Sequence, residues 1–386
     1  MFIQIVISNS IDNLMPRPDL ITSDMSVLPL IPSIFVAFFV TLLFIAALRP
    51  LARSIRLVDK PGGRKRHVGE IPVIGGIAMF LGLIVAWSLL PAGYPTPLHL
   101  GIAGILLVTI GALDDKYTMP PSVRFLTQVS VVLIMVYGSD LRMFDIGNPF
   151  GFGVIHLGPM SLFITALITV SVINAFNMMD GIDGLAGTMA LIALVSIALV
   201  SGYQNPIAAI ALLAAASVIA FLMTNFPTIY NRRARTFMGD AGSMFIGFVV
   251  VWVTMGVSQG AEAVASPVIC LWFAALPIYD LFTRFVLRMR KGHSPFRPAR
   301  DHFHHTLMRS GMRVRRVLSV LTGLQLTYAI VGLIAHFAGV ADVIMFMAWS
   351  ALGISQYWII GKLAALYRLG QRKKRRAAAR VAVTQN

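Results

Sequence analysis

The sequence predicts an all-α polytopic membrane protein, because of its composition, its apolar runs and the placement of its basic residues. The chain has 386 residues, of which 57% are hydrophobic and only 12% are charged, whereas a soluble domain usually has about 25% charged residues. Its mean hydropathy is +0.79, and runs long enough to cross a bilayer recur along the chain. We therefore expect one membrane domain, residues 27–363, between an N-terminal tail (1–26) and a basic C-terminal tail (364–386).

The apolar runs indicate about eleven transmembrane helices, within a range of about 10–11. Proline-rich or glycine-rich stretches separate most of these runs, as in P-A-G-Y-P-T-P at 91–97. The single cysteine, Cys270, lies inside an apolar run, which excludes an intrachain disulfide. The candidate spans are 27–48, 72–90, 98–113, 122–138, 160–177, 185–201, 206–224, 243–259, 266–287, 318–339 and 343–363.

The basic residues predict how these spans are oriented. With an odd number of spans and the N-terminus outside, the inside loops are 49–71, 114–121, 178–184, 225–242, 288–317 and the tail from 364. Of the 32 Lys and Arg residues, only Arg17 and Arg142 then lie clearly outside, as the positive-inside rule requires. The net charge of +16 therefore marks cytoplasmic loops rather than nucleic-acid binding. We expect a multi-pass protein of the cytoplasmic (inner) membrane, with its C-terminus in the cytoplasm.

Two adjacent acids end the third span, in the stretch G-A-L-D-D-K-Y at 111–117. Asp114 and Asp115 repel each other, and the pair becomes favourable when a cation lies nearby. The alternative is that these acids simply cap the loop.

The stretch N-A-F-N-M-M-D-G-I-D-G-L-A-G at 174–187 places four polar residues three apart. On a helix this spacing gives a drifting stripe on one side, which would face a polar cleft rather than lipid. A glycine follows each acid, so that the backbone can turn and approach a bulky ligand. The alternative is helix capping, with Asp183 as the N-cap of the next helix. The four residues are Asn174, Asn177, Asp180 and Asp183.

Two further inside loops carry groups suited to phosphates. In T-F-M-G-D-A-G-S-M-F at 236–245, Asp240 stands between glycines at the start of an apolar span, where backbone N–H groups suit a phosphate. Phe237 is a candidate stacking surface for a base, although plain loop-end packing is the alternative. In H-S-P-F-R-P-A-R-D-H-F-H-H at 293–305, three histidines cluster with arginines. Those arginines favour an anionic phosphate over a zinc ion.

The basic stretch R-K-R-H-V-G-E-I-P-V-I-G-G at 64–76 contains Lys65 and His67 as candidate substrate-binding residues. Topology alone explains its charge, but not its spacing of glycine and proline. Taken together, the carboxylates and the basic groups point to a phosphate substrate bridged by Mg²⁺, which uses few protein carboxylates. Mn²⁺ is the alternative ion. A polar face against the membrane implies one soluble and one lipid substrate.

These motifs, in this order, resemble the polyprenyl-phosphate N-acetylhexosamine-1-phosphate transferase family (glycosyltransferase family 4, the MraY/WecA superfamily). The matching stretches are D-D (114–115), N-x-x-N-x-x-D-G-x-D-G-L (174–185), G-D-x-G-S (239–243), H-x-H-H (302–305), R-H-x-G-x-I-P-x-x-G-G (66–76) and P-I-x-D (277–280). H-x-H-H followed by M-R-S-G is similar to the WecA-like branch. The motifs cover residues 49–310, which is most of the chain.

The resemblance implies transfer of an N-acetylhexosamine phosphate, with N-acetylglucosamine as the expected sugar, from a UDP-sugar to a polyprenyl phosphate such as undecaprenyl phosphate. UMP leaves, and homodimers are common among proteins that resemble this fold. The implied roles fall into three groups. Asp240 is the leading Mg²⁺ ligand, and Asp114 and Asp115 share the metal or deprotonate the lipid phosphate. The nucleotide-sugar cleft is lined by Asn174, Asn177, Asp180 and Asp183, with Phe237 on the uracil, and the phosphates are held by His302, His304, His305 and Arg300.

Two other functions remain as alternatives. A transferase of the MraY type would use a muramoyl-pentapeptide donor, for which the loop 293–311 offers no assignable platform. A transporter for an anionic solute would also place polar groups in a membrane bundle. Transporter sites, however, tend to lie near the bilayer midplane in repeated halves, whereas these acids lie at the inner edge.

Overall fold

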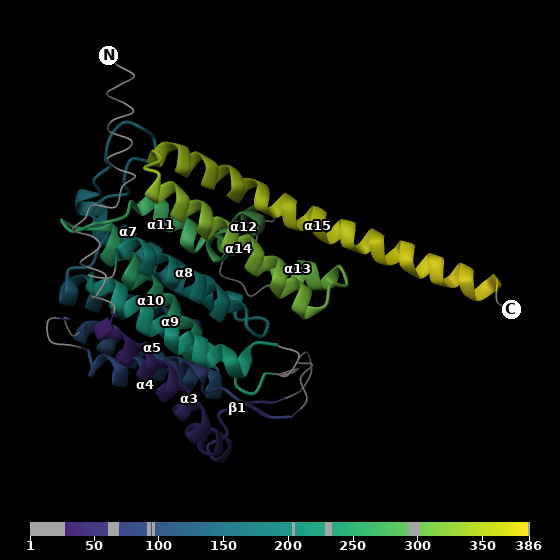
Figure 1. Cartoon of the computed structure of the whole chain (residues 1–386), viewed down its shortest axis with the longest axis horizontal. Coiled ribbons are helices and arrows are strands. Elements are labelled where there is room, and N and C mark those ends of the chain that lie inside the picture. Colours follow the sequence, from purple (N-terminus) through teal and green to yellow (C-terminus); the bar gives the residue numbers. More distant parts are fainter. Residues whose placement is uncertain are drawn as a thin grey trace.

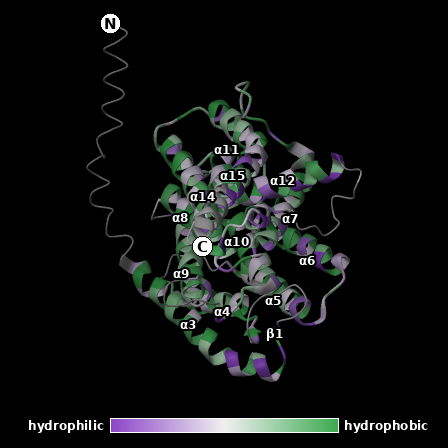
Figure 2. Cartoon of the chain, turned by 90° about the vertical axis from the view of Figure 1, so that its right-hand side faces the viewer, coloured by the Kyte–Doolittle hydropathy of each residue, from purple (hydrophilic) through white to green (hydrophobic). Residues whose placement is uncertain are grey.

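The computed structural model describes residues 28–60, 69–90, 94, 97–202, 205–227, 234–290, 292 and 302–384. Figure 1 shows a bundle of helices that run roughly alongside one another, with the last helix extending far beyond it. Figure 2 looks at that end of the bundle and shows hydrophobic segments on most helices. These features confirm the prediction of an all-α polytopic membrane protein.

The helices fall close to the predicted spans. They are η2 (Leu28–Leu30), α3 (Ile31–Ser54), α4 (Gly75–Trp87), α5 (Leu98–Tyr117), α6 (Pro121–Leu133), η3 (Ile134–Gly138), η4 (Gly158–Met160), α7 (Ser161–Met179), α8 (Leu185–Ser201), α9 (Pro206–Asn225), α10 (Gly239–Ser258), α11 (Pro267–Phe273), α12 (Ala275–Arg290), α13 (Phe303–Arg309), α14 (Val314–Phe337) and α15 (Asp342–Thr384).

The number of membrane crossings depends on which helices are long enough to span a bilayer. Among the described residues, 8 helices are long and apolar enough to cross a membrane, or up to 9 if the bent pair α11 and α12 forms one span. The apolar helices α4 and α8 match predicted spans but fall short of that length. The count of about eleven crossings therefore stays a prediction.

Helix starts follow local capping rules at two places. The Asn205 side chain accepts a hydrogen bond from the Ile207 N–H at 2.9 Å, and the Ser266 hydroxyl accepts one from the Val268 N–H at 3.1 Å. In both cases a proline follows the capping residue and occupies the first helical position, where its missing N–H costs nothing. These caps fix where α9 and α11 begin.

Helix α10 forms the centre of the bundle. Of its most apolar stretch, 89% is buried, against 17% for α15, and it packs against α4, α5, α7, α8 and α9. Its first turn lies so close to α4 that a Cβ on Gly76 would overlap the backbone of Gly242. Glycine at both positions therefore permits a backbone approach that any larger residue would prevent.

The spacing of glycine and proline in 64–76 has a structural explanation. The strands β1 (Val58–Asp59) and β2 (Ile71–Pro72) pair antiparallel. Beyond β2, the Gly75 N–H donates to the Phe237 carbonyl at 2.9 Å, and the Phe237 N–H donates to the Pro72 carbonyl at 2.9 Å. The end of this stretch therefore aligns the segment that leads into α10. Lys65 and His67 lie outside the described residues.

The ninth predicted span is broken. Helices α11 and α12 meet at an angle of 89°, a bend that the sequence analysis did not predict for residues 266–287. The buried Gln325 side chain of α14 bridges the break: its Oε1 accepts from the Leu276 N–H at 2.8 Å, and its Nε2 donates to the Phe273 carbonyl at 2.8 Å. A longer bond of 3.3 Å reaches the Trp272 carbonyl.

A second side chain satisfies the same break from α15. Trp349 Nε1 donates to the Leu271 carbonyl at 3.3 Å, and the Tyr279 hydroxyl donates to the Trp349 carbonyl at 2.6 Å. Backbone groups freed inside a membrane protein must find such partners, because lipid offers none. These hydrogen bonds from α14 and α15 therefore stabilise the bend, which sets the direction of α12.

The predicted boundary at residue 363 falls inside α15, the long yellow helix of Figure 1. This helix packs against α13, and Ala364 is fully buried. Arg316 Nη1 also donates to the Tyr367 hydroxyl at 3.2 Å. The first part of the basic tail is therefore a packed continuation of the last span.

Candidate functional site

Asp114, at the end of α5, is occupied by two local partners. Its Oδ1 accepts a hydrogen bond from the Met119 N–H at 2.6 Å, and its Oδ2 accepts one from Arg124 Nη1 at 2.9 Å. Only 7% of Asp114 is exposed. This acid therefore caps the turn between α5 and α6, as the capping alternative expects, and it also orients Arg124.

Asp115 points instead to the first turn of α10. Its Oδ1 accepts from the Asp240 N–H at 2.9 Å, and its Oδ2 faces the Ala241 N–H at 3.3 Å. A carboxylate at a helix N-terminus satisfies free N–H groups and the helix dipole. Asp115 thus fixes the backbone on which Asp240 is carried.

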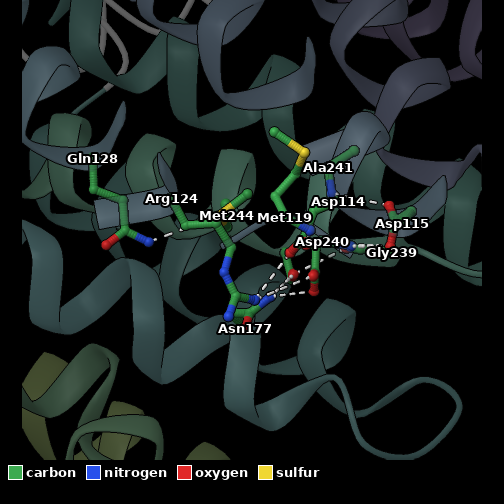
Figure 3. A network of polar contacts seen from close by, with 11 residues as sticks. Asp114, Asp115, Met119, Arg124, Gln128, Asn177, Gly239, Asp240, Ala241 and Met244 are labelled. Carbon is green, nitrogen blue, oxygen red and sulfur yellow. Dashed lines mark hydrogen bonds and ion pairs between the residues drawn. The ribbon is translucent and has the colours of Figure 1, made fainter. Parts of the chain in front are cut away.

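Asp240 is the meeting point of three helices, as Figure 3 shows. Asn177 Nδ2, from α7, donates to Asp240 Oδ1 at 2.7 Å and to the Ser243 hydroxyl at 2.9 Å. Arg124 Nη1, from α6, lies 3.6 Å from Asp240 Oδ2. The same guanidinium group therefore links Asp114 and Asp240.

Asn174 binds other groups than Asp240, the acid that Asn177 contacts. Its Nδ2 donates to Gln128 Oε1 at 2.8 Å and to the Val170 carbonyl at 2.8 Å. The bond to Gln128 joins α7 to α6, whereas Val170 lies one turn earlier on α7 itself. The position of Asn174 is therefore that of an interhelical contact, and its predicted role in the cleft stays a prediction.

Asp180 lies in the turn after α7, close to the other acids. Burial, together with repulsion from Asp240, Asp115 and Asp183, raises the pKa of Asp180 to about 8. Carboxylates that share one site cannot all ionise easily, so this shift indicates their proximity. We call Asp114, Asp115, Asp180, Asp183 and Asp240 the carboxylate cluster.

The capping alternative for Asp183 is wrong. The residue at the N-cap position of α8 is Gly184, not Asp183. The turn is held instead by Asn225, whose Oδ1 accepts from the Gly184 N–H at 2.7 Å and whose Nδ2 donates to the Thr236 carbonyl at 2.9 Å. Asn225 therefore ties the turn of 180–184 to the segment that leads into α10.

The three histidines of the H-x-H-H motif form a row, which we call the histidine row (His302, His304 and His305). The rings of His302 and His304 are parallel within 6°, with centroids 5.6 Å apart, and the centroids of His304 and His305 lie 4.2 Å apart. His304 lies against Gly181, because a Cβ at that glycine would overlap the imidazole. The row therefore borders the carboxylate cluster.

His304 is neutral across the physiological range. Burial and repulsion from His305 lower the pKa of His304 to about 3, and 1% of the residue is exposed. Neither ring nitrogen has a hydrogen-bond partner within the described part of the chain. A neutral imidazole can still donate one hydrogen bond and accept another, so His304 offers hydrogen bonds rather than charge.

For the other predicted site residues, the proposed roles stay predictions. Arg300, like Lys65 and His67, lies outside the described residues. Phe237 is half-buried, and its backbone is engaged with Pro72 and Gly75. Its proposed contact with a base stays a prediction.

Sequence reasoning missed several residues that build the site. Arg124 is the main cation of the cluster, and its signal was a basic residue in the first turn of a span that follows two acids. Sequence reasoning also assigned no role to Asp280, although an acid inside an apolar span is by itself a functional signal. Gln325 gave no signal beyond being a polar residue in an apolar helix.

The cluster fits a divalent cation that retains substrate ligands. Among the described residues, no three His, Cys, Asp or Glu side chains are arranged to hold a metal ion by themselves. Magnesium, however, is commonly bound through one or two carboxylates plus substrate phosphates. The mutual repulsion at Asp180 is relieved by such an ion, so the donor set is compatible with Mg²⁺ arriving with a phosphate substrate.

The fold and the cluster together define a polytopic membrane protein with an ionic site where several helix ends meet. Residues 98–258 match the family model described as glycosyl transferase family 4. That range includes all five acids of the carboxylate cluster.

Similar proteins cover most of the chain. The undecaprenyl-phosphate alpha-N-acetylglucosaminyl 1-phosphate transferase of Haemophilus influenzae is 35% identical over 351 residues, 89% of this chain and 98% of that protein. Proteins of the same name from Escherichia coli K12 and Salmonella typhi are each 34% identical. The first covers 78% of this chain and 82% of that protein, and the second covers 81% and 86%. The chain therefore belongs to glycosyl transferase family 4, and the resemblance drawn from its motifs is confirmed.

Proposed function

We propose that this protein transfers N-acetylglucosamine 1-phosphate from UDP-N-acetylglucosamine to undecaprenyl phosphate at the cytoplasmic face of the inner membrane. The observation that carries the proposal is the convergence of Asp115, Asp180 and Asp240 from three separate segments. The names of the 34–35% identical relatives support the sugar and the lipid.

The reaction exchanges one phosphoryl bond for another. An oxygen of the lipid phosphate attacks the β-phosphorus of the nucleotide sugar, and the bond between that phosphorus and the UMP oxygen breaks. Both substrates are anionic, so catalysis consists mainly of positioning and charge neutralisation. Mg²⁺, when bound, neutralises phosphate charge, and Asp240 and Asp115 are the residues that would hold it.

Each described residue then has a distinct task. Asn177 orients Asp240 through a bond of 2.7 Å. Arg124 balances the charge between Asp114 and Asp240. Because both oxygens of Asp114 are engaged, we assign it to orienting Arg124 rather than to removing a proton. His304 supplies a neutral hydrogen-bonding group beside Gly181.

The alternatives fit the structure less well. In transporters, broken spans place unsatisfied backbone groups around the solute. At the α11–α12 break, by contrast, the freed backbone groups are already bonded to the side chains of Gln325 and Trp349, so they do not face a solute. A muramoyl-pentapeptide donor lacks support in the names of the relatives.

The test uses membranes that carry the protein, undecaprenyl phosphate and a panel of UDP-sugars, with each lipid product identified by mass. We expect a product from UDP-N-acetylglucosamine, with other UDP-N-acetylhexosamines used more weakly. Preference for the muramoyl-pentapeptide donor would reject the sugar and keep the reaction type. Solute uptake into vesicles without any lipid product would reject the enzyme.

A further inference from the structure

Asp280 is a buried charge outside the carboxylate cluster. It lies on α12, one turn beyond the α11–α12 break, and only 1% of it is exposed. A buried carboxylate is costly unless it is paired and hydrogen-bonded. Its position therefore calls for partners that make use of both oxygens.

Both oxygens of Asp280 are directed at the start of α13. Oδ2 lies 2.6 Å from His302 Nδ1, and Oδ1 accepts from the Phe303 N–H at 2.9 Å. Because an ionised carboxylate can only accept, Nδ1 carries the proton in this contact. The contact thereby fixes Nε2 as the ring nitrogen of His302 that is turned away from Asp280.

The charge of Asp280 is matched from its own helix. Arg284 lies one turn further along α12, is 4% exposed, and has its Nε 3.9 Å from Asp280 Oδ1. The arrangement of Asp280, Arg284 and His302 is therefore a buried ionic group and not a solvated ion pair. Removing one member of such a group leaves the others uncompensated.

The contact extends from Asp280 to the turn that carries Asp180. His302 stacks on His304, and His304 lies against Gly181. The backbone break, held by Gln325, sets the direction in which α12 carries Asp280. A continuous path of packed groups therefore leads from the break to the carboxylate cluster.

We infer that Asp280 is a positioning residue that fixes the orientation and tautomer of His302 and so seats the histidine row against the Gly181 turn. The inference rests on the proposed function for its kinetic effect, but not for its effect on the imidazole. Groups that orient an active histidine are strongly coupled to it: in serine proteases, replacing the orienting aspartate by asparagine lowers kcat about 10⁴-fold with the geometry intact.

The first experiment compares Asp280→Asn with the parent enzyme. Asparagine has one acceptor oxygen in place of two, so it cannot give the Phe303 N–H and His302 Nδ1 a separate oxygen each, as Asp280 does. We expect kcat/KM for UDP-N-acetylglucosamine to fall about 10–100-fold, the range for groups that orient ligating histidines. The magnesium dependence should stay unchanged, because the carboxylate cluster is untouched. The control is Asp342→Asn, which removes an acid that binds the Asn148 N–H in another part of the chain.

The second experiment asks whether Asp280 acts through His302. In a double-mutant cycle, Asp280→Asn combined with His302→Gln should be no slower than His302→Gln alone. Additive losses would overturn the inference, because they would mean that Asp280 acts independently of the histidine. The same would follow if Asp280→Asn left kcat/KM at the parent value.

The third measurement does not need activity. In protein labelled with ¹⁵N-histidine, the signal lost in His302→Gln identifies His302, and we expect it to report a protonated Nδ1. Asp280→Asn should change that tautomer. If the parent makes no lipid product, the proposed function fails, while this signal still tests Asp280. A His302 signal that Asp280→Asn leaves unchanged would contradict the inference even in an active enzyme, and a parent Nδ1 without a proton would do so directly.

Discussion

The carboxylate cluster and the α11–α12 break are both polar regions within an apolar bundle, but they handle their polar groups in opposite ways. At the break, Gln325 satisfies three freed backbone groups, and the result is a fixed bend. At the cluster, acids from three segments face one another, and the pKa of Asp180 rises to about 8 because of burial and repulsion. Balanced polar groups serve to position helices, whereas unbalanced charge marks the place where an ionic ligand belongs.

The largest effect should come from Asp240→Asn. This change keeps the shape of the side chain but removes a charge where the phosphates and their cation would bind. We expect activity to fall about 10³-fold, the upper range for loss of one preorganised electrostatic group, while the melting temperature changes little. Turnover across a magnesium titration, alongside a thermal melt, checks both. A near-parental rate at ordinary magnesium would show that Asp240 is not the leading ligand.

A smaller but still large loss should follow Gly181→Ala. The added Cβ would overlap the His304 imidazole, which is buried and has little room to move. We expect about a tenfold to hundredfold loss of activity, comparable to the loss of an orienting group. The matched control is Gly323→Ala, because a Cβ at Gly323 meets nothing within 4 Å. Equal activity of the two variants would show that the position of the histidine row does not affect the reaction.

Gln325→Leu tests the α11–α12 break, where the polar groups are paired. Leucine has a similar size but leaves the Leu276 N–H and the Phe273 carbonyl without their partner. Each unsatisfied buried group costs about 1–3 kcal/mol, so the purified protein should melt at a clearly lower temperature. An unchanged melting temperature for Gln325→Leu would mean that the bend does not depend on this side chain.

The smallest expected effect is a link between pH and magnesium at Asp180. Its pKa is raised to about 8, so the folded protein holds a proton there that the unfolded chain, at its ordinary value, releases at lower pH. The contribution of Asp180 to stability therefore declines as pH rises from about 4 to about 8. A cation must displace this proton, so its apparent affinity should rise by up to tenfold per pH unit below about 8.

Thermal shifts measured across magnesium concentrations at several pH values test this link. Asp180→Asn removes the proton and should flatten the pH dependence. A dependence that survives unchanged in Asp180→Asn would assign the proton to another group.

The sequence predicted most of the fold because apolar runs and basic loops are strong local signals. The sequence also indicated that Asp115, Asp180 and Asp240 lie at the ends of predicted spans, and the structure brings the three acids together. The sequence could not reveal that Asn174 binds Gln128 or that Asp114 binds Arg124, because these partners follow from helix packing. The 89° break was hidden for a similar reason: the residue that stabilises it, Gln325, lies on another helix.

The central claim is that the carboxylate cluster carries phosphosugar transfer between two anionic substrates. The most direct measurement follows purified protein with undecaprenyl phosphate and UDP-N-acetylglucosamine, and quantifies UMP and the lipid product together. Our account predicts that one UMP appears for each lipid-linked sugar diphosphate, and that Asp240→Asn stops both while the folded protein remains. UMP release without a lipid product, or full transfer by Asp240→Asn, would contradict it.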